Sequence, residues 1–188
     1  MLPRGFQYRP DYLAAATAEQ LRDRLWQDLE WRQYPITLFG KTHPQPRLTS
    51  WCSDPGIHYR YSGTRLEAAA WHPELEALRQ RLHSELGTHF NSVLVNAYRD
   101  GEDAMGWHAD DEPELGGEPV IASVSLGQTR RLLIRSRGGG RSRVCDLENG
   151  SLLVMSGRSQ ADWVHSVPRT KKVVNLRINL TFRRVRPE

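Results

Sequence analysis

Leucine spacing predicts an amphipathic helix near the start of the chain. Between Leu21 and Leu29 a leucine recurs at every fourth position, the spacing that gathers side chains on one helical face. Thr17 and Gln20, just before this run, fit a capping box, in which the two side chains satisfy backbone N–H groups at the first turn. We therefore expect a helix that begins at Thr17 and runs to about Trp31.

A second run of leucines, from Leu75 to Leu86, follows the same helical period. Pro73 stands at a position that suits a first helical turn, and Gly87 readily adopts the left-handed conformation that ends a helix. The segment between the two helices is rich in Pro, Thr and Ser, and only residues 59–61 there have the pattern of a short strand. We therefore expect the first third of the chain to be helical, with loops.

From Ser92 onward the pattern changes to alternating apolar and polar positions, which is typical of β-strands. Glycine-rich turns separate several of these segments. The expected strands cover residues 92–99, 120–126, 131–136, 151–156, 162–166 and 172–184. Two helices followed by many strands predict an α+β fold on a curled antiparallel sheet, and a double-sheet jelly roll would limit its exposed edges.

Length and composition predict one globular domain that spans residues 1–188. No stretch approaches the roughly 20 apolar residues of a membrane span, and the N-terminus lacks the apolar core of a secretory signal. Cys52 and Cys145 have no CxxC partner, which favours free thiols in a reducing compartment. We therefore expect a monomeric cytoplasmic protein without membrane contact.

Charge adds a hint of phosphate recognition, because it is unevenly distributed along a chain whose net charge is only +4. Eight acidic residues fall within residues 100–118, whereas six arginines and no acid fall within residues 130–143. Seven Lys or Arg residues, again without an acid, fall within residues 169–186. Arginine clusters suit phosphate. The alternative is a solvated surface in a protein whose genome favours arginine codons.

The acidic segment contains two candidate metal ligands, His108 and Asp110. Residues i and i+2 of a strand point to the same face, so these side chains could bind one ion. Two similar His-x-Glu pairs, at residues 72–74 and 83–85, lie in or beside the second helix, where i and i+2 diverge. With seven His and ten Asp in the chain, one His-x-Asp alone is a weak signal.

His165, at the end of an expected strand, is the candidate for a third ligand. Two imidazoles and one carboxylate can hold one face of an octahedral metal and leave three positions open, as in non-haem Fe(II) enzymes. A lone histidine at such a position is more often an ordinary surface or core residue.

One strand near the C-terminus could bind a dicarboxylate. Its polar face carries Arg177, Asn179, Thr181 and Arg183, and a second strand presents Asn96 and Tyr98. Guanidinium, amide and hydroxyl groups without an acid to pair them could satisfy both carboxylates, with the two arginines approaching opposite ends. The alternative is a half-buried strand whose polar face is simply solvated.

The candidate metal ligands and the candidate dicarboxylate-binding residues occur in a particular order along the chain: Asn96 and Tyr98, then His108 and Asp110, then His165, then the strand from Arg177 to Arg183. This ordered set resembles the AlkB family of Fe(II)/2-oxoglutarate dioxygenases. The resemblance covers roughly residues 35–184 and is strongest to the branch of the second and third human AlkB homologues. It implies a double-stranded β-helix (jelly-roll) core with N-terminal helices packed on one sheet. It also implies a division into an N-terminal extension and helix (1–34), a substrate-recognition region (35–90) and the jelly-roll core (91–188).

The resemblance implies Fe(II), O2 and 2-oxoglutarate as cofactors and co-substrates. The implied catalytic iron ligands are His108, Asp110 and His165. The implied 2-oxoglutarate contacts are Asn96, Tyr98, Arg177, Asn179, Thr181 and Arg183. The implied reaction hydroxylates a methyl group on a base nitrogen and releases formaldehyde, which would repair N-alkylated DNA, with RNA as a further candidate substrate. In a bacterial host the protein would work at the nucleoid.

Six residues match family positions near the substrate: Phe39, Gly40, Lys41, Tyr59, Tyr61 and Asp111. A base inside a duplex must be flipped out, so Tyr61 would stack on it and Phe39 would fill the vacated stack. The alternatives are core packing for both aromatic residues and a solvated acid for Asp111. The loop over residues 136–143 is either a phosphate-binding arm or a flexible turn.

Two other functions stay open. The same iron chemistry could act on a protein side chain or a small molecule, although the basic segments and Phe39 and Tyr61 argue against this. A catalytically silent nucleic-acid-binding module would require a broken ligand triad or arginine strand, and in this sequence both are intact.

Overall fold

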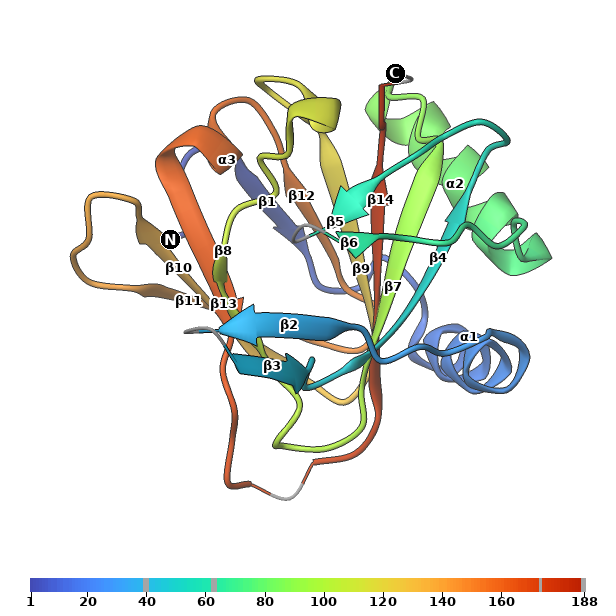
Figure 1. Cartoon of the computed structure of the whole chain (residues 1–188), viewed down its shortest axis with the longest axis horizontal. Helices are drawn as coiled ribbons and strands as arrows, with labels where there is room; N and C mark the ends of the chain where they lie inside the picture. Colours follow the sequence, from blue (N-terminus) through green and yellow to red (C-terminus); the bar gives the residue numbers. More distant parts are fainter. Residues whose placement is uncertain (39–40, 62–63, 173, 187–188) are drawn as a thin grey trace.

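Two large antiparallel sheets form the core of the fold, as a computed structural model describes it for residues 1–38, 41–61, 64–172 and 174–186 (Figure 1). The larger sheet has the strand order β1-β12-β9-β14-β7-β4, and the smaller has the order β11-β10-β13-β8. The strand bounds are β1 Phe6–Arg9, β4 Leu48–Ser53, β7 Ser92–Tyr98, β8 Met105–His108, β9 Ile121–Gly127, β10 Arg130–Ser136, β11 Arg143–Leu147, β12 Leu152–Met155, β13 Trp163–Val167 and β14 Arg177–Arg183.

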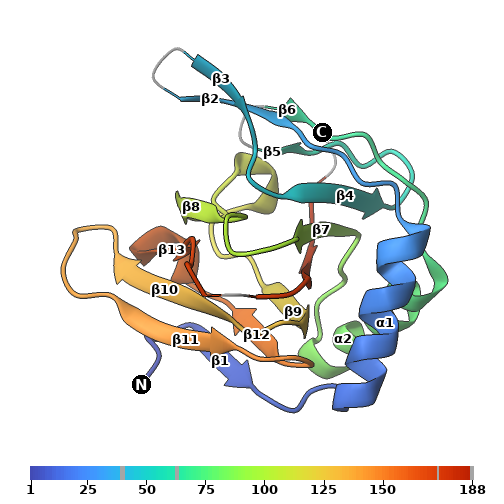
Figure 2. The same cartoon turned by 90° about the horizontal axis from the view of Figure 1, so that it is seen from below.

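Two helices, α1 (Ala15–Asp28) and α2 (Pro73–Leu86), cover the outer face of the larger sheet (Figure 2). Leu25 of α1 and Leu75 of α2 are fully buried in the core cluster that these helices share with the sheet. The expected jelly roll with helices on one sheet is therefore confirmed. Within the described residues, neither of these 14-residue helices has the length and apolar character to span a membrane.

Local signals place α2 correctly. Pro73 is its first residue, and His72 caps it by accepting the backbone N–H of Glu74 at 3.2 Å. Gly87 ends the helix at φ +63°, a left-handed conformation that glycine adopts without strain, and its N–H donates to the carbonyl of His83.

The expected bounds of α1 are wrong at both ends. Its N-cap is Ala14, which makes no side-chain cap, so the capping box at Thr17 does not form. Alanine has the highest helix propensity, so the helix begins before Thr17. It ends at Asp28 rather than Trp31, because Leu29 turns to an extended conformation.

The first third of the chain is not simply helical with loops. It supplies β1 and β4, which form the two edges of the larger sheet. It also supplies hairpins β2 (Pro35–Leu38) with β3 (Lys41–Pro44) and β5 (Arg60–Tyr61) with β6 (Thr64–Arg65), which Figure 2 shows beyond β4. The β4 sequence LTSWCS does not alternate between apolar and polar residues. Its serines and its threonine are buried together with Trp51 and Cys52, so burial does not follow residue polarity in this strand.

Short helical segments complete the connections: the 3-10 turn Pro113–Leu115 and the helix α3, Ser159–Asp162. The expected strands 92–99, 120–126, 131–136, 151–156 and 162–166 correspond to β7, β9, β10, β12 and β13, with small shifts at their ends. The last strand, β14, begins at Arg177 rather than at residue 172. Its alternation is confirmed, because Ile178, Leu180 and Phe182 pack in the core cluster that contains both helices.

Candidate active site

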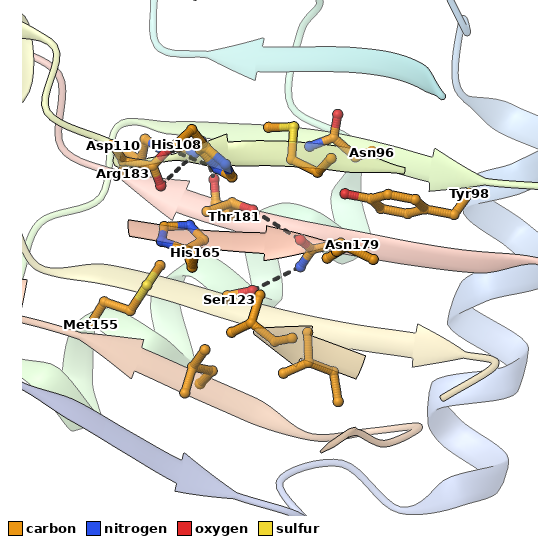
Figure 3. A pocket seen from close by; sticks show the side chains of 15 residues that line it. Asn96, Tyr98, His108, Asp110, Ser123, Met155, His165, Asn179, Thr181 and Arg183 are labelled. Carbon is orange, nitrogen blue, oxygen red and sulfur yellow. Dashed lines mark hydrogen bonds and ion pairs between the residues drawn. The ribbon is translucent and has the colours of Figure 1, made fainter. Parts of the chain in front are cut away.

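Three candidate metal ligands converge between the sheets. His108 ends β8, Asp110 follows two residues later, and His165 of β13 pairs with His108 across the strands. The imidazole centroids lie 4.3 Å apart, and His108 Nε2 lies 3.9 Å from Asp110 Oδ1. One ligand atom from each residue lies within 4.8 Å of the others. The side chains line one pocket (Figure 3), as the sequence predicted.

One hydrogen bond at His108 and the burial of both imidazoles favour the form that binds a metal. His108 Nδ1 lies 2.9 Å from the carbonyl oxygen of Gly106. A carbonyl can only accept, so Nδ1 carries the proton and Nε2 offers its lone pair. Burial lowers the pKa of His108, and it lowers the pKa of His165 to about 3. Both rings are therefore neutral at pH 7, the form that binds metals.

Asp110 is a carboxylate although it is only 1% exposed. Burial by itself would raise its pKa, but Arg183 and the two imidazoles outweigh burial and lower the pKa to about 2. Arg183 Nη2 donates to Asp110 Oδ2 at 2.9 Å. The triad therefore offers one negative charge and two neutral nitrogen donors at neutral pH.

The atoms of this triad fit a divalent cation. Among the described residues, Asp110 Oδ1 and His165 Nδ1 are buried without a hydrogen-bond partner. Leaving such an atom unsatisfied costs roughly 1–3 kcal/mol, so these atoms are suited to an ion or to its water ligands. Two imidazoles with one carboxylate are the donor set of non-haem Fe(II) sites, and the cluster lacks the thiolates typical of a structural zinc site.

Polar side chains of β7 and β14 form one wall of the pocket beside the triad (Figure 3). Asn96 of β7 pairs in register with Asn179 of β14. Asn179 Nδ2 donates to Ser123 Oγ at 2.8 Å, and Thr181 Oγ1 lies 3.4 Å from Asn179 Oδ1. Asn96 Oδ1 accepts from Thr49 Oγ1 at 3.0 Å. The expected polar face therefore points between the sheets rather than into solvent.

The two arginines of β14 are both buried, one at each end of this strand. Arg183 lies at the triad, whereas Arg177 Nη2 donates to Ser125 Oγ at 3.0 Å and its guanidinium lies 5.1 Å from the Tyr98 ring centroid. In the part of the chain that the structure describes, Arg177 Nε and Nη1 have no hydrogen-bond partner. Burial lowers the pKa of Arg177 to about 10, so it stays cationic at pH 7. A buried guanidinium with unpaired N–H groups is suited to binding an anion.

The candidates for substrate contact are less clearly placed. Phe39 and Gly40 lie outside the described residues. Lys41 begins β3 and is exposed, and Tyr61 is the last residue of the short strand β5. Tyr59 is 1% exposed and packs in a buried cluster. Their roles stay predictions.

Asp111 is exposed and forms an ion pair with Arg137, in the connection between β10 and β11. Arg137 also donates to the carbonyl of Gln160 through Nη2 at 2.9 Å. One arginine therefore ties the loop over residues 136–143 to the turn that carries the metal ligand Asp110. Phosphate binding by this loop stays a prediction.

Several residues that hold the site in place carry no recognisable signal in the sequence. Arg130 was counted in a candidate phosphate-binding cluster, yet it is 4% exposed. It donates to the carbonyls of Asp100, Asp103 and Pro168 and lies over the Tyr98 ring. Its partners are backbone atoms from two distant loops, so no sequence motif could have identified it. The same holds for Gln160.

Known proteins are similar to this chain in sequence. A family model described as the 2OG-Fe(II) oxygenase superfamily matches residues 5–183. Alpha-ketoglutarate-dependent dioxygenase alkB homolog 3 of Rattus norvegicus is 40% identical over 189 residues, which cover 95% of this chain and 63% of the relative. DNA oxidative demethylase ALKBH2 of Mus musculus is 39% identical over 183 residues, which cover 92% of this chain and 77% of the relative.

The solved structure of OsALKBH1 has the same fold, with a TM-score of 0.67 at 20% identity. The match covers 97% of this chain and 99% of that one. The human alkB homolog 3 is 39% identical to this chain, which spans 65% of its length. The chain thus spans slightly less than two thirds of the alkB homolog 3 relatives. The chain belongs to the 2OG-Fe(II) oxygenase superfamily, in its AlkB branch near the second and third homologues, whose chemistry uses Fe(II), 2-oxoglutarate and O2.

Proposed function

We propose that this chain is an oxidative demethylase that removes methyl groups from base nitrogens in DNA, with RNA as a second substrate. One observation carries the proposal: the His108, Asp110 and His165 triad shares a pocket with the buried guanidinium of Arg183 and with the amides of Asn96 and Asn179. That combination suits a metal together with a dianionic co-substrate. The relatives named DNA oxidative demethylase support nucleic acid as the substrate class.

The two buried arginines suggest how 2-oxoglutarate would be oriented. Arg183 contacts the metal ligand Asp110, so it would meet the carboxylate that lies nearer the metal. Arg177, with two unpartnered nitrogen atoms among the described residues, would bind the other carboxylate beside Tyr98. Charge-assisted hydrogen bonds of this kind are stronger than neutral ones, which favours a dianion over a neutral ligand.

Bound Fe(II) and 2-oxoglutarate would supply the oxidising chemistry, in which one oxygen atom of O2 enters succinate and the other enters the methyl group. Carbon dioxide leaves with succinate, and the hydroxylated methyl group leaves the base nitrogen as formaldehyde. The chain itself binds and orients. Its triad holds the metal, β14 holds the co-substrate, and the hairpins beyond β4 with Asp111 would contact the extruded base.

The test is to incubate the protein with Fe(II), 2-oxoglutarate and oligonucleotides that carry single N-methylated bases. Single-stranded DNA, duplex DNA and RNA versions of one sequence should be compared. A mass loss equal to one methylene group identifies the substrate. Asp110→Ala should show none, whereas Asp162→Ala, which removes an acid outside the triad, should behave as wild type. Succinate release that rises only when a protein or small molecule is added, with the oligonucleotides unchanged, would instead favour that substrate class.

A further inference from the structure

Gln160 lies behind the metal triad and contacts one of its members. It is the second residue of α3 and is 1% exposed. Its Oε1 accepts the backbone N–H of Asp110 at 2.9 Å. Its Nε2 donates to Ser159 Oγ at 3.2 Å and lies 3.4 Å from the sulfur of Met155, which lines the pocket (Figure 3). Both ends of the side-chain amide are therefore used, which fixes its orientation.

The three triad members are held by different means. His108 and His165 lie in paired strands, where ladder hydrogen bonds fix their backbones. Asp110 lies beyond the end of β8, in a segment without regular secondary structure. The contact with Gln160 therefore supplies to Asp110 the backbone restraint that the ladder supplies to the two histidines.

The backbone of Gln160 is itself held from the outer side. Its carbonyl accepts from Arg137 Nη2 at 2.9 Å and from Arg137 Nε at 3.3 Å. Arg137 also pairs with Asp111, the neighbour of the metal ligand. The turn that carries Asp110 and Asp111 is thus connected to α3 through the Gln160 side chain on one side and through Arg137 on the other.

We infer that Gln160 is a positioning residue of the metal site, which holds the backbone of Asp110 so that its carboxylate faces the two imidazoles. The inference rests on the metal-binding part of the proposed function and is independent of the substrate. Partners that orient metal ligands typically contribute tenfold to a hundredfold to metal affinity. Gln160 should therefore affect metal binding before it affects any later step.

Mn(II) affinity, measured by electron paramagnetic resonance on the whole chain, tests this inference without turnover. Gln160→Met keeps an unbranched side chain of similar length and loses the acceptor, so its affinity should fall roughly tenfold to a hundredfold. Gln160→Glu keeps an acceptor for the Asp110 N–H and should recover most of that loss. Asp162→Ala is the control within α3, because the Asp162 side chain pairs with Arg158 and forms no hydrogen bond with Gln160 or Asp110 among the described residues.

A purely structural role for Gln160 gives a different pattern. It would lower the thermal midpoint of Gln160→Met and leave the Mn(II) affinity of the folded protein equal to that of Asp162→Ala, which would overturn the inference. If Gln160→Met does not fold, the wild-type protein still provides a test. The Asp110 amide proton should exchange slowly by NMR, and exchange at the rate of an unstructured chain would equally overturn it.

Failure of this inference is distinguishable from failure of the proposed function. A wild-type protein that binds Mn(II) yet changes no methylated oligonucleotide refutes the proposed function and leaves the role of Gln160 intact. A wild-type demethylase whose Gln160→Met variant binds Mn(II) normally refutes only the role of Gln160.

Discussion

Removing Arg183 should cost the metal-free protein far more stability than removing an arginine from an exposed ion pair of similar length. Arg183 Nη2 lies 2.9 Å from Asp110 Oδ2, with side chains 4% and 2% exposed. Arg158 Nη2 lies 2.7 Å from Asp162 Oδ1, with side chains 69% and 44% exposed. Distance is thus nearly matched while burial differs, so the comparison isolates the effect of solvent.

The expected magnitudes follow from this difference in burial. An exposed pair contributes about 0–1 kcal/mol, because water screens the charges, so Arg158→Met should be nearly neutral. Removing one partner of a buried pair leaves an uncompensated charge and costs roughly 3–5 kcal/mol. Without Arg183, burial would favour protonation of Asp110, which limits the loss. We therefore expect Arg183→Met to lose about 3 kcal/mol in free energy of unfolding at pH 7.

Urea denaturation at pH 7, followed by tryptophan fluorescence, measures both losses, provided the m-values agree. The double variant Arg183→Met with Asp110→Asn removes both charges and should recover much of the loss, since no unpaired charge remains. Equal losses in the two single variants would show that Asp110 is not a buried anion held by Arg183. The lowered pKa of Asp110 would then be wrong as well.

Three further predictions concern pH, the co-substrate and a tight backbone contact. Lowering the pH from 7 to 5 should destabilise the metal-free protein by about 2 kcal/mol through His165. The His165 imidazole has a pKa of about 3 in the folded protein and about 6.5 in the unfolded chain. Between pH 7 and pH 5 the unfolded chain therefore binds a proton at His165 that the folded protein does not bind. Urea denaturation should show that His165→Gln does not lose this stability between pH 7 and pH 5. An equal pH dependence in the wild-type protein and in His165→Gln would contradict the prediction. Arg177→Gln should raise the KM for 2-oxoglutarate roughly tenfold to a hundredfold, measured by succinate release, with unchanged Mn(II) affinity; a shift in Mn(II) affinity alone would argue against its assignment. Gly101→Ala should lower the thermal midpoint, because an added Cβ would collide with the carbonyl oxygen of Thr170; an unchanged melting curve would show that the loops can separate freely.

Much of the fold could be predicted because its signals are local. The helix α2 carries its own start in Pro73 and its own stop in Gly87, and the alternation of residues 176–183 fixes which face of β14 is apolar. The strands β1 and β4 were both missed: β1 alternates over only four residues, and β4 has no local pattern that marks it as a strand. Four of the six residues of β4 are Ser, Thr or Cys, and they are buried only because the sheet and the segments around it cover both faces.

The restraints on the site could not be predicted for a related reason. Gln160 and Arg130 act on backbone atoms of distant segments, and any residue type can supply a carbonyl or an N–H. Their positioning role depends on where they lie in the folded chain, because their partners are backbone groups that no residue type identifies in the sequence. The iron ligands and the arginine strand could be identified because metal and carboxylate binding require particular side chains at particular spacings.

Burial decides between the two explanations of the polar face of β14. A solvated strand would keep its arginines in water, yet Arg177 is 0% and Arg183 is 4% exposed. A buried guanidinium is stable only beside an anion or several acceptors. Arg183 has Asp110, whereas no carboxylate among the described residues forms an ion pair with Arg177. A dianion that reaches from the metal triad to Tyr98, whose ring centroid lies 5.1 Å from the Arg177 guanidinium, would bring a carboxylate to this arginine.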